Sequence, residues 1–206
     1  MQIAITSEAL LSSVAIQKFI MKKIIILVFL SLSIFCNAQN VSVEKSVFGI
    51  QTGFLGIWGH NESRLSNKIA LRSELGFDTG FWGGFFYDED GFLLTPVLTL
   101  EPRFYYNLNK RNSKSKNITN NSGNFISVKT SYHPDWFVIS SVKDISIISD
   151  ISFIPTFGIR RNIGTHFNYE AGLGFGYRYI FAKAAGYYSN ESEATANLHL
   201  RIGYVF

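Results

Sequence analysis

The feature of this sequence that most limits its possible folds is a two-residue alternation of apolar and polar side chains. In residues 194–206, every second residue is Ala, Leu, Ile, Tyr or Phe, and the residues between them are Thr, Asn, His, Arg, Gly and Val. Successive side chains of a β-strand point to opposite faces of the sheet. The spacing therefore predicts a long strand with one apolar face and one polar face.

The same alternation recurs earlier in the chain, so we expect an all-β protein. Seven alternating segments are clear, but an up-and-down barrel with both chain ends on one side needs an even number of strands. Residues 80–87 supply an eighth, short strand, between turns predicted at 78–80 and 88–91. The predicted strands of this antiparallel, up-and-down barrel lie at about 45–59, 67–78, 80–87, 92–108, 123–141, 147–161, 166–181 and 193–206.

Charge is confined to one face of these strands. At 17% charged residues, roughly forty apolar-face positions would hold about seven charges if facing were random, and they hold none. In a soluble barrel the apolar face points inward, whereas in a transmembrane barrel it points outward to lipid. The opposite face carries the residues expected to form a charge network in the lumen: Arg72, Glu74, Glu101, Arg103, Lys129, Arg160, Glu170, Arg178 and Arg201.

A targeting segment favours the transmembrane arrangement. Residues 21–23 read Met-Lys-Lys, residues 24–35 are almost wholly apolar, and Cys36-Asn37-Ala38 follows. A basic start, a short apolar run and a small-residue exit are typical of a secretory signal peptide, with cleavage predicted after Ala38. The apolar run is shorter than the roughly 20 residues that a membrane-spanning helix needs.

The chain is thus divided into three parts: residues 1–20, a signal peptide at 21–38 and a barrel at 39–206. Residues 1–20 are explained either by initiation at Met21 or by an extended signal peptide. A lipoprotein reading would make Cys36 the lipidated residue, but Ser33-Ile34-Phe35 fits that cleavage poorly. Since Cys36 is the only cysteine, the mature chain has neither a disulfide nor a cysteine-ligated metal.

The charge balance argues against a nucleic-acid partner. The whole chain has 19 basic and 15 acidic residues. Setting aside Glu8, Lys18, Lys22 and Lys23, which precede the predicted cleavage site, leaves 16 basic and 14 acidic residues. The four histidines, His60, His133, His166 and His199, have no nearby partner ligand in sequence, so we predict no metal site and no cofactor.

Two features fit a closed barrel less easily. Pro96, Pro102 and Pro155 fall inside predicted strands, where proline cannot donate to the ladder, so we expect bulges or strand ends there. A sandwich with edge strands would accommodate these prolines more easily. Residues 107–122 have loop composition but would be long for a turn on the periplasmic side.

The chain end carries a family resemblance. The pattern Leu198-x-Leu200-x-Ile202-x-Tyr204-x-Phe206 resembles the terminal recognition strand of outer-membrane barrel proteins. The mature chain is similar in size and pattern to the small OmpA/OmpX-type barrels of Gram-negative bacteria. That resemblance implies insertion into outer-membrane lipid by the barrel-assembly machinery, which would read the last strand.

The leading functional expectation is a non-enzymatic barrel whose outer loops bind an unidentified ligand or shield the surface. An eight-stranded lumen has room only for side chains, so its charges should pair into a plug. A lipid A acyltransferase or deacylase, using His60 with Ser63 or His133 with Ser131, is the second hypothesis. A soluble, secreted β-sandwich or lipocalin-like binder is the third.

Overall fold

The computed structural model describes residues 41–82, 91–143 and 145–206. The expectations for the N-terminal segment and the signal peptide lie outside these described residues. No helix among the described residues is long and apolar enough to cross a membrane.

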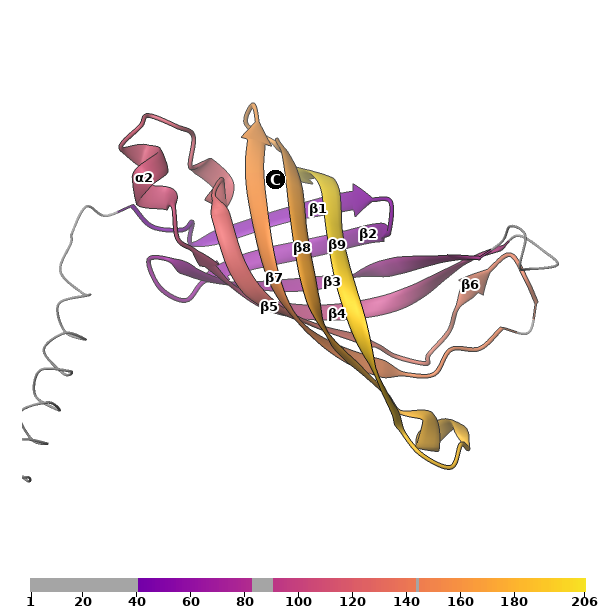
Figure 1. Ribbon diagram of the computed structural model, residues 1–206. Coiled ribbons are helices and arrows are strands. Elements are labelled where there is room, and N and C mark those ends of the chain that lie inside the picture. Colours follow the sequence, from indigo (N-terminus) through magenta and orange to yellow (C-terminus); the bar gives the residue numbers. More distant parts are fainter. Residues whose placement is uncertain (1–40, 83–90, 144) are drawn as a thin grey trace, which may run out of the picture. The chain divides into compact units, whose positions relative to one another are not determined.

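Antiparallel strands joined in chain order make up nearly all of the described chain (Figure 1). The ladder runs β3-β2-β1-β9-β8-β7-β5-β4, and pairing of β3 with β4 closes these eight strands into a ring. The ninth strand, β6, pairs only with Leu93 and Leu94 of β4. The predicted all-β, antiparallel barrel architecture is confirmed. The strands are β1 (Ser46–Gly53), β2 (Gly56–Arg64), β3 (Ile69–Trp82), β4 (Gly91–Tyr105), β5 (Asn124–His133), β6 (Ile139–Ser140), β7 (Asp150–Ile163), β8 (Phe167–Ile180) and β9 (Glu191–Val205).

Two predicted strands in the N-terminal half are wrong, at 45–59 and at 80–87, although the number of ring strands is right. Residues 80–82 belong to β3, and 83–87 lie outside the described residues. The predicted strand 45–59 is a hairpin, in which β1 and β2 flank a turn at Phe54-Leu55. Two apolar turn residues hid this break, while Gly56, with a φ of 147°, takes the backbone conformation that the turn requires. The predicted turn at 78–80 is instead part of β3, which stays paired with β4 through Trp82.

The prolines are accommodated without the expected bulges. Pro102 and Pro155 lie within β4 and β7, and the register of each ladder is the same on both sides of the proline. In the ladder between β4 and β5, Pro102 and the residue before it have no pairing partner. In the ladder between β7 and β8, the same is true of Pro155 and the residue before it. Pro96 lies in the gap between the stretches of β4 that pair with β5 and with β6. A proline is tolerated where its missing N–H has no ladder partner.

One end of the ring is covered by the long loop at 106–123, and we call it the capped end. This loop contains α2 (Leu108–Asn112) and the 3-10 turn η1 (Thr119–Asn121). The loop contributes to a small apolar core beneath it, which consists of Val43, Ala70, Tyr105, Leu108 and Phe125. The opposite end, which we call the far end, carries the Phe54-Leu55 turn, residues 134–143 and 145–149, and the 3-10 turn η2 (Ala182–Ala185).

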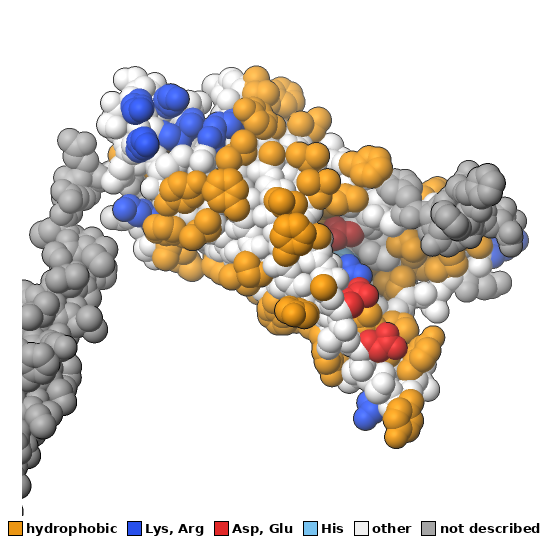
Figure 2. Space-filling view, in the orientation of Figure 1, with side chains coloured by type: hydrophobic (Ala, Val, Ile, Leu, Met, Phe, Trp, Pro, Cys, Tyr) orange, Lys and Arg blue, Asp and Glu red, His pale blue; other side chains and the backbone are white. Residues whose placement is uncertain are grey.

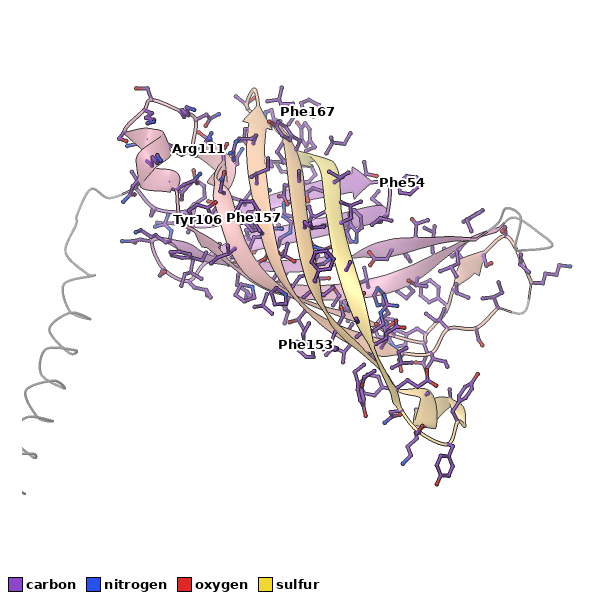
Figure 3. All side chains as sticks on the ribbon, viewed as in Figure 1. Phe54, Tyr106, Arg111, Phe153, Phe157 and Phe167 are labelled. Carbon is purple, nitrogen blue, oxygen red and sulfur yellow. The ribbon has the colours of Figure 1, made fainter. Side chains whose placement is uncertain are left out.

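The outer face of the ring is apolar and the inner face is polar. On β9, Leu198 is 55% exposed and Ile202 is 64% exposed, whereas Arg201 between them is 5% exposed. Hydrophobic side chains cover the outside of the strands in Figure 2, and Figure 3 shows Phe153, Phe157 and Phe167 projecting from that outer wall. An unbroken strand over 45–59 would place Trp58 on the same face as the outward-facing Phe48 and Ile50, but Trp58 points into the lumen, because β2 begins a new alternation after the turn.

Candidate functional site in the barrel lumen

The lumen at the capped half of the barrel is filled by eight charged side chains, which we call the lumen network. Each lies on the inward-facing set of its strand, and the strands that contribute them are β2, β3, β4, β7, β8 and β9. All eight are buried. The members are Glu62, Arg72, Glu74, Glu101, Arg103, Arg160, Glu170 and Arg201.

Glu62 is the centre of the network. Its Oε1 accepts from Nη1 of Arg160 at 2.8 Å, from Nη1 of Arg103 at 3.0 Å and from Nη1 of Arg72 at 3.2 Å. Its Oε2 accepts from the Tyr105 hydroxyl at 3.0 Å and from the Asn121 side-chain amide at 2.8 Å. One carboxylate from β2 thereby joins three guanidinium groups that come from β3, β4 and β7.

Glu170 bridges the same three guanidinium groups from the opposite wall. Its oxygens lie 3.1 Å from Nη1 of Arg103, 3.1 Å from Nε of Arg160 and 3.3 Å from Nη1 of Arg72. Nε2 of His199 lies 2.8 Å from Oε2 of Glu170, and the Gln51 amide donates to Oε1 at 2.9 Å. The contacts of Glu170 across the lumen link β8 with β3 and β4, which are not its neighbours in the ring, as well as with the adjacent β7.

The other two carboxylates of the lumen network, Glu101 and Glu74, pair with one and two arginines respectively. Glu101 accepts two hydrogen bonds from Arg103, at 2.8 and 3.0 Å, and one from the Ser127 hydroxyl at 2.6 Å. Glu74 contacts Arg72, and it accepts from Nη1 of Arg201 at 2.8 Å. The remaining face of Arg201 lies on the Trp58 ring, with Cζ 3.6 Å from the ring centroid, which is the geometry of a cation–π contact.

The lumen network is balanced in charge, since it holds four carboxylates and four guanidinium groups. Buried charges are stable only when they are paired and hydrogen-bonded. Because the paired side chains fill the lumen at the capped half, the arrangement can stabilise the barrel and block the passage of ions. At the capped end it is covered by Tyr105 and Phe125, with the Arg103 guanidinium 4.1 Å from the Phe125 ring centroid.

Two residues expected in the charge network lie outside it. Arg178 is at the far end, where its side chain is 37% exposed and lies near Asp150, at 3.6 Å, and Glu193, at 3.3 Å. Lys129 points into the lumen, but it makes no ion pair among the described residues. The structure brings together the other seven: Arg72, Glu74, Glu101, Arg103, Arg160, Glu170 and Arg201.

Sequence reasoning missed the central residue of the network. Residues 60–66 were left outside the predicted strands, because the outward side of β2 at the capped end carries Asn61 and Ser63 rather than apolar residues. Glu62 therefore belonged to no recognisable alternation. The sequence did contain a signal for this turn, because Gly53 and Gly56 lie on either side of it. The inward-facing side chains of β2 begin after the turn with Trp58.

Neither His–Ser pair of the enzyme hypothesis is joined by a hydrogen bond among the described residues. His60 points into the lumen, where Nε2 lies 3.1 Å from Nη2 of Arg160, while Ser63 is on the outer face. His133 lies near Ser131 in sequence, but its ring nitrogens bond to Asp150 at 3.0 Å and to Asp78 at 3.1 Å. The Ser131 hydroxyl bonds to that of Thr99 at 2.9 Å.

No group of three or more His, Cys, Asp or Glu among the described residues could hold a metal ion. His166, at the barrel surface, stacks on Tyr204 with ring centroids 5.1 Å apart.

Comparison with protein-family models, with curated proteins and with solved structures finds no match to this chain.

Proposed function

We propose that this chain is an integral outer-membrane β-barrel with a structural or surface-binding role rather than a catalytic or conducting one. The observation that carries the proposal is the inverted distribution of side chains, with apolar residues outside and eight paired charges inside. In a soluble barrel such an outer face would meet water, and contiguous apolar patches of more than a few hundred Å² are rare on soluble monomers. If hydrocarbon lies outside the ring, both the apolar outer face and the charged inner face are explained.

The strand lengths agree with this proposal. A tilted transmembrane strand needs about 9–11 residues to cross the hydrocarbon. The shortest ring strands, β1 and β2, have 8 and 9 residues, and β3, β4, β7, β8 and β9 have 14 or 15. Each ring strand is therefore about long enough to span the apolar layer, and most extend beyond it.

Basic residues at the capped end also suit a membrane boundary. A cluster of them is visible near α2 in Figure 2, and Figure 3 places Arg111 close to Tyr106 at this end. Cations just outside an apolar band are attracted to anionic lipid headgroups. The basic side chains that line a hollow at this end are Lys110, Arg111, Lys114, Lys116 and Arg161.

The terminal strand supports insertion by the barrel-assembly machinery. Leu198, Leu200, Ile202, Tyr204 and Phe206 all lie on the outer face of the barrel. As the last strand, β9 pairs with β1 and so closes the ring. A machinery that reads this strand would act on the segment whose pairing completes the fold.

Fractionation and electrophoresis test the proposal. The chain expressed with its N-terminal segment should remain in the outer membrane after carbonate washing, and unboiled protein should migrate differently from boiled protein. Recovery of the folded protein in the soluble periplasmic fraction would refute the membrane assignment. Sustained single-channel currents in planar bilayers would refute the closed lumen.

A further inference from the structure

A cavity of about 540 Å³ occupies the lumen at the far half of the barrel, next to the lumen network. Trp58, Lys129, Asn197 and Arg201 line it from the network side. In Figure 2, acidic and basic side chains show beside the far half of β9. Small-molecule sites usually have volumes of about 300–1,000 Å³, so this cavity is large enough to hold a ligand.

The barrel wall is lower on one side of this cavity. Strand β9 pairs with β1 only over 201–205, so among the described strands residues 191–200 have no partner on that side. Likewise β3 pairs with β2 only as far as Asp78, and the Thr79 N–H donates to the Leu55 carbonyl at 2.8 Å, leaving 80–82 without a described partner there. The short β1–β2 hairpin therefore leaves a notch in the wall between β9 and β3 (Figure 1).

The residues that line the cavity indicate that it opens to the outer surface through this notch. Leu198 and Leu200 lie on the outer face of β9, and both also line the cavity. Leu55, at the tip of the β1–β2 hairpin, lines it as well. The cavity consequently has a polar part inside the barrel and an apolar part at the notch, which opens onto the band that we propose faces lipid.

Lys129 is the one cation of this cavity that makes no ion pair among the described residues. Its side chain is inward-facing and 7% exposed, and its Nζ contacts the Asn197 side-chain oxygen at 3.5 Å, which is at the limit of a hydrogen bond. A buried ammonium group is costly when it lacks an anionic partner. A bound anion would supply that partner.

The other charged groups of the cavity are already engaged. The two carboxylates, Asp78 and Asp150, both bond to the ring nitrogens of His133. Asp78 also accepts from Nε1 of Trp58 at 2.7 Å. Arg178 lies near Asp150 and Glu193, and Arg201 is paired with Glu74. Lys129 is therefore the group left to bind a negatively charged ligand.

We propose that this cavity binds an amphiphile with one anionic headgroup and an alkyl chain, with the headgroup at Lys129 and the chain leaving through the notch between β9 and β3. The inference rests on the proposed membrane location, because the notch would then open toward lipid. The anionic group is identified by its chemistry, a carboxylate or a phosphate. A polar cavity with an apolar side exit fits such a molecule better than a small inorganic ion.

Quenching of Trp58 fluorescence tests the proposal. Trp82 and Trp136 are replaced by Phe so that Trp58 is the reporter, and the full chain is held in a neutral maltoside detergent. The probe is dodecanoic acid brominated on its chain, and the matched control is the methyl ester of the same acid. The acid should quench Trp58 with an apparent affinity at least tenfold higher than that of the ester.

Two variants identify the headgroup site. Lys129→Met removes the ammonium group, and Asn197→Asp places a carboxylate against it without changing side-chain size. Both should weaken acid binding at least tenfold and leave ester binding unchanged, whereas Lys68→Met, an exposed lysine at the capped end, should change neither. Heat-modifiable mobility of each variant shows that it is folded, and Asn197→Asp provides the answer if Lys129→Met does not fold.

Several outcomes would overturn the proposal. Equal quenching by acid and ester, or undiminished quenching in folded Asn197→Asp, would remove the anion site. Competition by acetate or inorganic phosphate as effective as that by dodecanoate would remove the alkyl-chain site. A protein that stays in the outer membrane but shows no quenching refutes this inference alone, whereas recovery in the soluble fraction refutes the proposed function on which it rests.

Discussion

The side-chain amide of Asn121 donates a hydrogen bond of 2.8 Å to Glu62, so the loop that covers the capped end is attached directly to the centre of the lumen network. The Asn121 side-chain oxygen accepts from the backbone N–H of Glu44 at 2.7 Å. One buried side chain thus connects the segment before β1, the loop between β4 and β5, and the ion pairs inside the barrel. The stability of the cap and that of the network are consequently coupled.

This attachment can be tested at two neighbouring asparagines with the same backbone conformation. Asn120 and Asn121 have φ values of 51° and 60°, a region that glycine tolerates well. Asn121→Gly should lower the free energy of unfolding by about 1–3 kcal/mol, because it removes one of the two hydrogen bonds to the buried Oε2 of Glu62 and also removes the acceptor of the Glu44 backbone N–H. Asn120→Gly removes only an exposed hydrogen bond to Thr165 and should cost less. Urea unfolding, followed by the mobility of unboiled protein, measures both, and equal losses would contradict the coupling.

The network should be most sensitive to loss of the Glu62 charge. Glu62→Gln keeps the side-chain size but leaves three buried guanidinium groups sharing one fewer carboxylate. Removing one partner of a buried ion pair typically costs about 3–5 kcal/mol. We expect a loss of that order in the free energy of unfolding. Glu193→Gln, which changes a solvent-exposed pair with Arg178 at the far end, should cost less than about 1 kcal/mol.

A pair of leucine-to-arginine substitutions distinguishes a lipid-facing wall from a water-facing one. Leu198 on β9 and Leu65 in the loop between β2 and β3 are similarly exposed, at 55% and 61%. In a membrane barrel, Leu198→Arg should destabilise the fold by about 2–4 kcal/mol, whereas Leu65→Arg, beyond the strand ends, should cost about 0–1 kcal/mol. Refolding into lipid vesicles at a series of urea concentrations gives both values. Equal tolerance of the two changes would argue against lipid at Leu198.

The inward glycine at position 158 provides room for an aromatic ring. A Cβ atom at Gly158 would lie 2.7 Å from Cε2 of Phe125, whose ring also contacts the Arg103 guanidinium. Gly158→Ala should therefore destabilise the barrel by about 1–3 kcal/mol through overpacking. A Cβ at the outward Gly59 would have its nearest neighbour at 3.8 Å, so Gly59→Ala is the matched control and should be tolerated. Thermal unfolding of the two variants in one detergent compares them directly.

The C-terminal half of the fold was predictable because its alternation is regular. In β8 and β9 most outward residues are apolar and most inward residues are polar or small, so the facing and, to within two residues, the strand limits followed from spacing. The N-terminal half was not predictable in the same way. Phe54 and Leu55 form a turn despite being apolar, and 78–80 continues a strand despite having turn composition. In each case strand pairing overrode the local preference.

What the sequence determined by itself is the division of side chains between the two faces, since a strand's geometry fixes that division from residue spacing alone. Tertiary structure decided which inward charges meet. Glu62 reaches Arg103 and Arg160 only because closure of the ring brings β4 and β7 within reach of β2. The four carboxylates of the lumen network pair with arginines, so none of them pairs with Lys129. The notch beside β9 likewise follows from the length of the β1–β2 hairpin, which depends on strand pairing and not on hydrophobic pattern.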